Sequence, residues 1–128
     1  MIIDSSALCA ILFDEPDAAR YAAAIAAAET RRVSAVNLLE TAIVVESRGG
    51  PPGGSQLDAL IERAAIEVVP VTVTQIAAAR TAWRRFGKGN HPAGLNLGDC
   101  LAYALSQTNR EPLLFKGRDF VHTDIETA

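Results

Sequence analysis

Four acidic residues in distant parts of the chain lie where predicted strands end or predicted helices begin. Asp4 ends the first predicted strand, and Asp119 follows the last one. Glu40 opens the helix after the second strand, and Asp99 lies in the first turn of the helix that leads into the last strand. Such carboxylates repel one another unless a cation neutralises them. Their oxygens suit Mg²⁺ or Mn²⁺, so we expect a metal site.

The elements that must position these acids alternate between strands and helices. Strands are predicted over residues 2–3, 32–35, 66–71 and 112–115, and helices over 7–13, 18–29, 37–47, from 55 onward, 74–86 and 96–107. The Gly- and Pro-rich stretch 49–54 is predicted to be a surface turn, and residues 87–94 a loop. This alternation indicates one α/β domain over residues 1–128, with a mainly parallel sheet between layers of helices. Ligands bind beyond the carboxyl ends of such strands.

Each acid also has a purely structural interpretation. Asn37 with Glu40, and Asn96 with Asp99, have the spacing of a capping box, in which the acid three residues on bonds the backbone of the cap residue. Asp4 could simply cap the helix that follows it. Taken singly, these interpretations are the simpler ones. Capping does not explain why all four acids meet one edge of the sheet.

Composition limits the class of protein. The 128 residues are 49% hydrophobic and 21% charged, which is typical of a globular domain and excludes a disordered chain. The two cysteines are too few for a disulfide scaffold and lack the spacing of a zinc finger. We expect no signal peptide, no membrane span and a reducing cytoplasm around the protein.

The charge is distributed unevenly. The formal net charge is −3, yet residues 68–98 contain no acid and four basic residues, namely Arg80, Arg84, Arg85 and Lys88. These side chains are either a solvated helix face or contacts for a phosphate backbone. Setting the four acids aside as metal ligands changes the charge of the remaining chain from −3 to +1. Net acidity therefore does not exclude a nucleic acid as a partner.

Four motifs occur together in a familiar order and spacing. They are Asp4-Ser5-Ser6-Ala7, Asn37-Leu38-Leu39-Glu40-Thr41, Leu95-Asn96-Leu97-Gly98-Asp99-Cys100 and Leu114-Phe115-Lys116-Gly117-Arg118-Asp119-Phe120. With them, essentially the whole chain resembles PIN-domain ribonucleases, in particular the VapC toxins of toxin–antitoxin pairs. The resemblance implies a three-layer PIN-like α/β/α fold.

The resemblance also implies roles for individual residues. Asp4, Glu40, Asp99 and Asp119 match the acidic quartet that holds one or two Mg²⁺ or Mn²⁺ ions. Ser6 matches a small hydroxyl residue that supports the first aspartate. Asn96 matches a frequent asparagine, for which we favour helix capping over catalysis. The implied partners are an RNA substrate, a VapB-like antitoxin and a second copy of the chain.

Residues around the last acid depart from the family pattern or extend it. Gly117 stands where many members have a further acid, which puts a second metal in doubt. Asp124 is near enough in sequence to replace that acid, although it could equally lie in a turn. Lys116 and Arg118 flank Asp119 and are further candidates for RNA contacts. His91 is expected to have no functional role.

The resemblance and the acids together predict metal-dependent hydrolysis of RNA. Asp4, Asp99 and Asp119 would be ligands, and Glu40 would hold the attacking water or help to deprotonate it. Asp99→Asn should then abolish cleavage with thermal stability almost unchanged.

Three other functions have some support in the sequence. A PIN-like domain could bind RNA or a partner without cutting. A receiver-like signalling domain needs an acid at the end of a central strand, which the third predicted strand lacks. A haloacid-dehalogenase-type phosphatase needs Asp-x-Asp on the first strand, whereas this chain has Asp4-Ser5-Ser6.

Overall fold

Four short parallel strands form the centre of the computed structural model, which describes residues 1–128. They are β1 (Ile2–Ile3), β2 (Arg32–Ser34), β3 (Glu67–Val69) and β4 (Leu113–Leu114), in the order β3-β2-β1-β4. β1 pairs in parallel with both β2 and β4, so the strand that ends at Asp4 is central. This agrees with the predicted parallel sheet.

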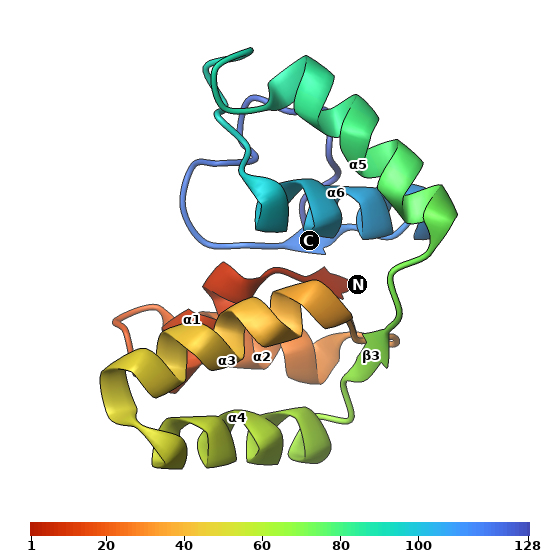
Figure 1. The fold of residues 1–128 in the computed structure, drawn as a ribbon. Coiled ribbons are helices and arrows are strands. Elements are labelled where there is room, and N and C mark those ends of the chain that lie inside the picture. The colour runs from red at the N-terminus through yellow and green to blue at the C-terminus, as the bar shows by residue number, and fades with distance from the viewer.

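Six helices surround the sheet. They are α1 (Ser5–Leu12), α2 (Ala18–Ala27), α3 (Ala35–Gly49), α4 (Pro51–Arg63), α5 (Val73–Phe86) and α6 (Leu97–Asn109). Figure 1 shows α5 and α6 on one side of the strands and α1 to α4 on the other. The predicted three-layer α/β/α architecture is therefore confirmed. No helix is long and apolar enough to cross a membrane.

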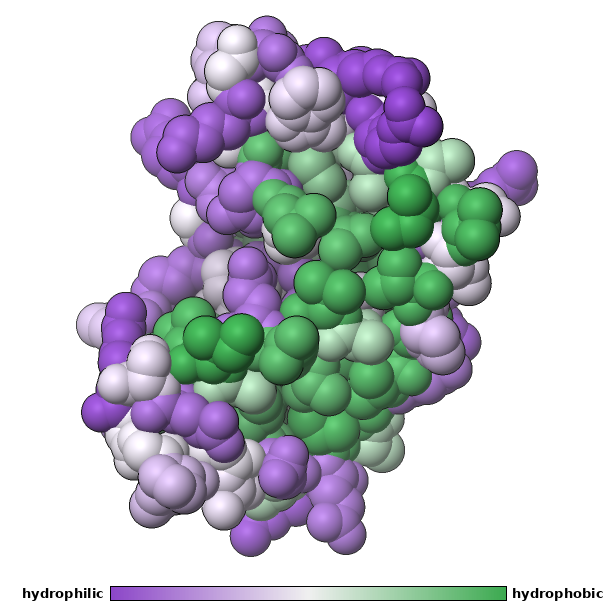
Figure 2. Space-filling model, in the orientation of Figure 1, coloured by the Kyte–Doolittle hydropathy of each residue, from purple (hydrophilic) through white to green (hydrophobic).

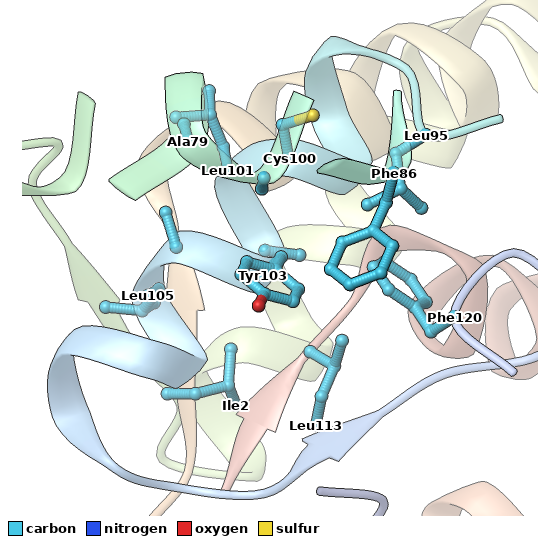
Figure 3. Packing of buried hydrophobic residues seen from close by; sticks show 13 residues of the cluster. Ile2, Ala79, Phe86, Leu95, Cys100, Leu101, Tyr103, Leu105, Leu113 and Phe120 are labelled. Carbon is cyan, nitrogen blue, oxygen red and sulfur yellow. The ribbon is translucent and has the colours of Figure 1, made fainter. Parts of the chain in front are cut away.

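The sheet separates two hydrophobic cores, because successive side chains of a strand point to opposite faces. Ile2 and Leu113 belong to the core beneath α5 and α6, where they pack near Tyr103 and Leu105 (Figure 3). Their neighbours Ile3 and Leu114 lie in the second core, with residues of α1 and α2. Both faces of β1 are thus fully buried, which holds the end of this strand in a fixed position.

The observed strands are shorter than predicted. The third covers only Glu67–Val69 of the predicted residues 66–71, because Pro70 has no N–H to donate to a ladder. The fourth pairs only at Leu113–Leu114. The predicted helices are present, with ends that differ from the prediction by a few residues.

The predicted turn over residues 49–54 is wrong, because α4 already begins at Pro51. Gly50 ends α3 with φ +66°, a conformation that side chains disfavour. Prolines are accepted in the first turn of a helix, where an N–H has no helical partner. Gly53 and Gly54 then let α4 pack directly on α3, since a Cβ at Gly53 would lie 2.6 Å from the carbonyl oxygen of Val45.

This close approach predicts a difference between two glycines. Gly53→Ala should lower the free energy of unfolding by about 1–3 kcal/mol, because backbone must move to admit the methyl group. Gly49→Ala should change it by less than about 1 kcal/mol, since a Cβ there meets nothing within 4 Å. Urea unfolding of both variants checks this, and equal losses would contradict the proposed cause.

Candidate active site

Asp4 is buried at the carboxyl end of β1, where it also caps α1. Its backbone N–H donates to the carbonyl of Leu114 at 2.9 Å, which ties it to β4. Its Oδ2 accepts hydrogen bonds from the backbone N–H of Ser6 at 3.0 Å and the Ser6 hydroxyl at 2.5 Å. Its Oδ1 is buried and has no hydrogen-bond partner. A buried carboxylate oxygen without a donor is costly unless it serves another purpose.

Asp99 lies in the first turn of α6 and completes the predicted capping box. The Asn96 side chain accepts from the Asp99 N–H at 2.9 Å, and Asp99 Oδ2 accepts from the Asn96 N–H at 3.1 Å. The capping role expected of Asn96 is therefore present. The cap uses only Oδ2 of Asp99, so helix capping does not account for the other carboxylate oxygen, Oδ1.

Glu40 is not part of a capping box, so the alternative structural interpretation of Asn37 with Glu40 is wrong. α3 begins at Ala35 with Ser34 as its N-cap, which places Glu40 beyond the first turn. The Ser5 hydroxyl donates to Glu40 Oε1. Glu40 also lies directly against Gly98, where any side chain would collide with its carboxylate oxygens. Glu40 is thereby held next to Asp99.

Two residues that position Glu40 are missing from the sequence prediction. Asn37 is fully buried, and its Nδ2 donates to the carbonyl of Gly98 at 3.0 Å and to Ser5 Oγ at 3.4 Å. It therefore connects α3, α1 and the start of α6. Ser5 in turn is hydrogen-bonded to Glu40, so Asn37 supports Glu40 through Ser5. The sequence does contain an indication of this role, because Asn37 is a polar residue in an otherwise apolar stretch before Glu40. The capping pattern offered a simpler explanation for it.

Asp119 is the exposed member of the group. It follows β4 in a loop that is anchored to α1, because the Lys116 N–H donates to Ser6 Oγ at 2.9 Å. Ser6 therefore links Asp4 to the loop that carries Asp119, in agreement with the supporting role expected of it. Gly117 has φ +96°, so an acidic residue at this position would be strained in this backbone.

The four acids share one electrostatic environment. Burial raises the pKa of Asp4 to about 6, and the charges of Glu40 and Asp119 add to this effect. Burial likewise raises the pKa of Asp99 to about 7, with further contributions from Asp4, Asp119 and Glu40. Each of these two buried carboxyl groups is therefore within electrostatic range of the other three acids. No three His, Cys, Asp or Glu side chains are close enough in this structure to form a metal-binding group by themselves.

Comparison with known proteins shows the family of this chain. The PIN domain family model matches residues 1–126. The chain is 54% identical over 128 residues to Ribonuclease VapC30 of Mycobacterium tuberculosis, covering 100% of this chain and 98% of that protein. It is also 54% identical over 125 residues to Ribonuclease VapC of Mycolicibacterium smegmatis, covering 98% and 97%.

The chain belongs to the VapC ribonucleases of the PIN-domain family. Its fold is similar to the crystal structure of Mycobacterium tuberculosis VapC20, a sarcin–ricin loop cleaving toxin, with a TM-score of 0.80 at 15% identity. That match covers 99% of this chain and 97% of the other. A toxin–antitoxin complex from Klebsiella pneumoniae matches with a TM-score of 0.71 at 14% identity, covering 96% and 92%. Membership of this family excludes the receiver-like and phosphatase interpretations.

The basic residues of this VapC ribonuclease differ in their availability. Arg80, Arg84 and Lys88 line one pocket and have no ion-pair partner. Arg118 is exposed and also unpaired. The ammonium of Lys116, by contrast, pairs with Glu15 and, at 2.8 Å, with Asp17. These two ion pairs argue against the RNA contact expected of Lys116.

Asp124 is engaged away from the quartet. The Tyr103 hydroxyl donates to its Oδ1 at 2.5 Å, and Arg85 pairs with its Oδ2 at 3.2 Å. These contacts lower the pKa of Asp124, with the Tyr103 hydrogen bond as the larger cause. They hold the C-terminal segment against α5 and α6. Asp124 and Arg85 thus have structural partners, which argues against metal binding by one and RNA binding by the other.

Proposed function

We propose that this VapC ribonuclease is an Mg²⁺- or Mn²⁺-dependent endoribonuclease whose site consists of Asp4, Glu40, Asp99 and Asp119. One observation supports this site above all. Asp4 Oδ1 is buried without a hydrogen-bond donor, beside a second carboxyl group whose pKa is raised by burial. An all-oxygen set of this kind fits a hard divalent cation, which would offset the repulsion among the four acids.

Each residue then has a distinct task. Asp4, Asp99 and Asp119 would hold the cation, and their supports Ser6 and Asn96 keep two of these carboxylates oriented. Glu40, held through one oxygen by Ser5, would accept a proton from the attacking water through the other. A bound cation supplies positive charge that activates water and offsets charge on the phosphate. The expected products are a 5′-phosphate and a 3′-hydroxyl.

The decisive experiment uses the purified protein, free of antitoxin. It is incubated with total RNA in the presence of Mg²⁺ or of EDTA, and the cleaved ends are mapped. We expect discrete cleavage sites with Mg²⁺ and none with EDTA. Cleavage that continues in EDTA would refute metal dependence, and no cleavage under either condition would favour a PIN-like domain that only binds.

Gly98 offers a test of Glu40 that leaves every acid in place. Gly98→Ala should reduce cleavage by about 100-fold, because the methyl group would displace the Glu40 carboxylate that acts on water. Glu40 is a flexible side chain, so folding should be largely preserved. Rates and melting temperatures of the variant and the parent are compared. Parental activity in the folded variant would argue against the role of Glu40.

Two partners and a compartment complete the proposal. A VapB-like antitoxin would inhibit the enzyme by placing a basic side chain among the four acids. A second copy would cover the exposed apolar residues Leu39, Ile43 and Val73, whose exposed fractions are 59%, 59% and 88%. Light scattering should then give about twice 13.6 kDa. The free thiols of Cys9 and Cys100 are consistent with a reducing cytoplasm.

A further inference from the structure

A pocket with a volume of about 510 Å³ lies between α5 and the beginning of α6, outside the acidic quartet. Apolar residues such as Ile76, Leu95 and Leu101 form its walls. Figure 2 shows apolar surface continuing into this region, with hydrophilic groups along its border. The pocket is lined by no acidic residue. An apolar group can therefore bind in this pocket, and no carboxylate in its wall would repel a negatively charged ligand.

Trp83 gives this pocket a large aromatic surface. It is the only tryptophan of the chain, and it is 50% exposed although it is one of the largest apolar side chains. Gly87 lies so close to the indole that any side chain there would collide with it. The Trp83 carbonyl accepts from the Gly87 N–H at 2.8 Å and from Asn90 Nδ2 at 3.2 Å. These bonds fix the main chain at Trp83, and the absence of a side chain at Gly87 leaves room for the indole.

Three cations line the same pocket. Arg80 and Arg84 are one helical turn apart on α5, and Lys88 follows where the helix has ended. None of the three forms an ion pair within the chain. Unpaired cations beside an aromatic side chain match a nucleotide, which presents a flat base and a charged phosphate. They do not match an apolar peptide or the apolar face of a second copy.

The pocket also shares a wall with the proposed active site. Asn96 and Cys100 line it, and Asp99 lies between them in the sequence. Asn96 is bonded to Asp99 through both its side chain and its N–H. The pocket therefore extends to the residues on either side of Asp99, which places it within reach of an RNA strand bound at the acids.

We propose that this pocket binds an unpaired nucleobase of the RNA, adjacent to the cleaved phosphate, by stacking on Trp83. Arg80, Arg84 and Lys88 contact the phosphates on either side of that base. The inference rests on the proposed function and adds a requirement to it. A base within a duplex cannot enter the pocket, so the enzyme selects sites where this nucleotide is unpaired.

Trp83 itself reports on the first test, because it is the only tryptophan. The protein in EDTA is titrated with a short single-stranded oligoribonucleotide, with its duplex, and with a sugar–phosphate strand that lacks bases. We expect saturable quenching of the indole fluorescence by the single strand and little by the other two. Equal quenching by the strand without bases would overturn the proposal.

Substitutions supply the second test, with binding read from the anisotropy of a labelled single strand. Trp83→Leu should weaken binding by about 5- to 100-fold, and Trp83→Phe should retain most of it. Val121→Ala, at another exposed apolar position, should change it by less than about twofold. Circular dichroism and light scattering establish that each variant is folded and of parental mass. A folded Trp83→Leu variant with parental affinity, or one whose mass changes instead, would overturn the proposal.

The two proposals fail separately. Metal-dependent cleavage without base-dependent quenching would leave the ribonuclease in place and remove the nucleobase pocket. Base-dependent quenching without cleavage would support the nucleobase pocket and remove the ribonuclease activity. Cleavage positions give a further check, since annealing a complementary strand across a mapped site should protect it.

Discussion

Asp99→Asn is expected to reduce metal-dependent RNA cleavage by more than about 100-fold and to stabilise the metal-free protein near pH 8. The loss of activity follows from removing one carboxylate of the proposed cation site. The gain in stability follows from burial, because a neutral amide replaces a charge that three other acids repel. Asparagine keeps a side-chain oxygen for the Asn96 N–H, so the helix cap survives. The sequence-based expectation of unchanged stability is revised for this reason.

The sign of the pH dependence follows from the raised pKa. In the folded protein the Asp99 pKa is about 7, against 3.8 for an ordinary aspartate. Between these values the folded state binds more protons than the unfolded state, so this group lowers stability as the pH rises from about 4 to 8. The variant lacks this loss and should exceed the parent by about 1–3 kcal/mol at pH 8. The difference should vanish near pH 4.

Urea unfolding in EDTA at several pH values measures the change in stability. The rate of RNA cleavage with Mg²⁺ measures the loss of activity. The matched control is Asp58→Asn, because Asp58 is an exposed aspartate of α4. It should leave both quantities within error of the parent. Mg²⁺ should raise the melting temperature of the parent and much less that of Asp99→Asn. Cleavage by the variant at a tenth of the parental rate or more would refute the assignment.

Asn37→Asp should lower the free energy of unfolding by at least about 3 kcal/mol at pH 7. The Asn37 side chain is fully buried and donates to the Gly98 carbonyl and to Ser5 Oγ. A carboxylate would face that carbonyl oxygen with a negative charge and would lie close to an existing group of acids. The loss should be smaller near pH 4, where the new carboxyl group can remain protonated and donate.

Asn90→Asp is the matched control for this substitution. Asn90 also donates its amide to a main-chain carbonyl, that of Trp83 at 3.2 Å, but it is exposed. Its replacement should cost no more than about 0.5 kcal/mol. Chemical denaturation of both variants at pH 4 and pH 7 gives the comparison. Equal losses at both positions would show that burial of Asn37 is not the cause.

Local sequence patterns were sufficient for the order of the elements and for the positions of Asp4 and Asp99 at the ends of their elements. Ile2 and Ile3 form a buried β-branched pair, and Asp4 follows them directly, so the place of this carboxylate depends on residues next to it. The capping box of Asn96 and Asp99 is likewise a relation over three residues. Since parallel strands present their carboxyl ends at one edge, these local facts were enough to place the acids near that edge, and their assembly around a cation stays a prediction.

Only the tertiary structure decided how each of these groups is partnered. Asn37 is separated from Gly98 by 61 residues, and Lys116 from Glu15 by 101, so their contacts have no local signature. The glycines after Pro51 have the local pattern of a turn. Their actual role is to let α4 lie close to α3, and this role depends on a second helix. Trp83 and Asn96 line one pocket only because α5 packs on α6. Local spacing determined which side chains reach the sheet edge, and long-range packing determined which of them remain free to act there.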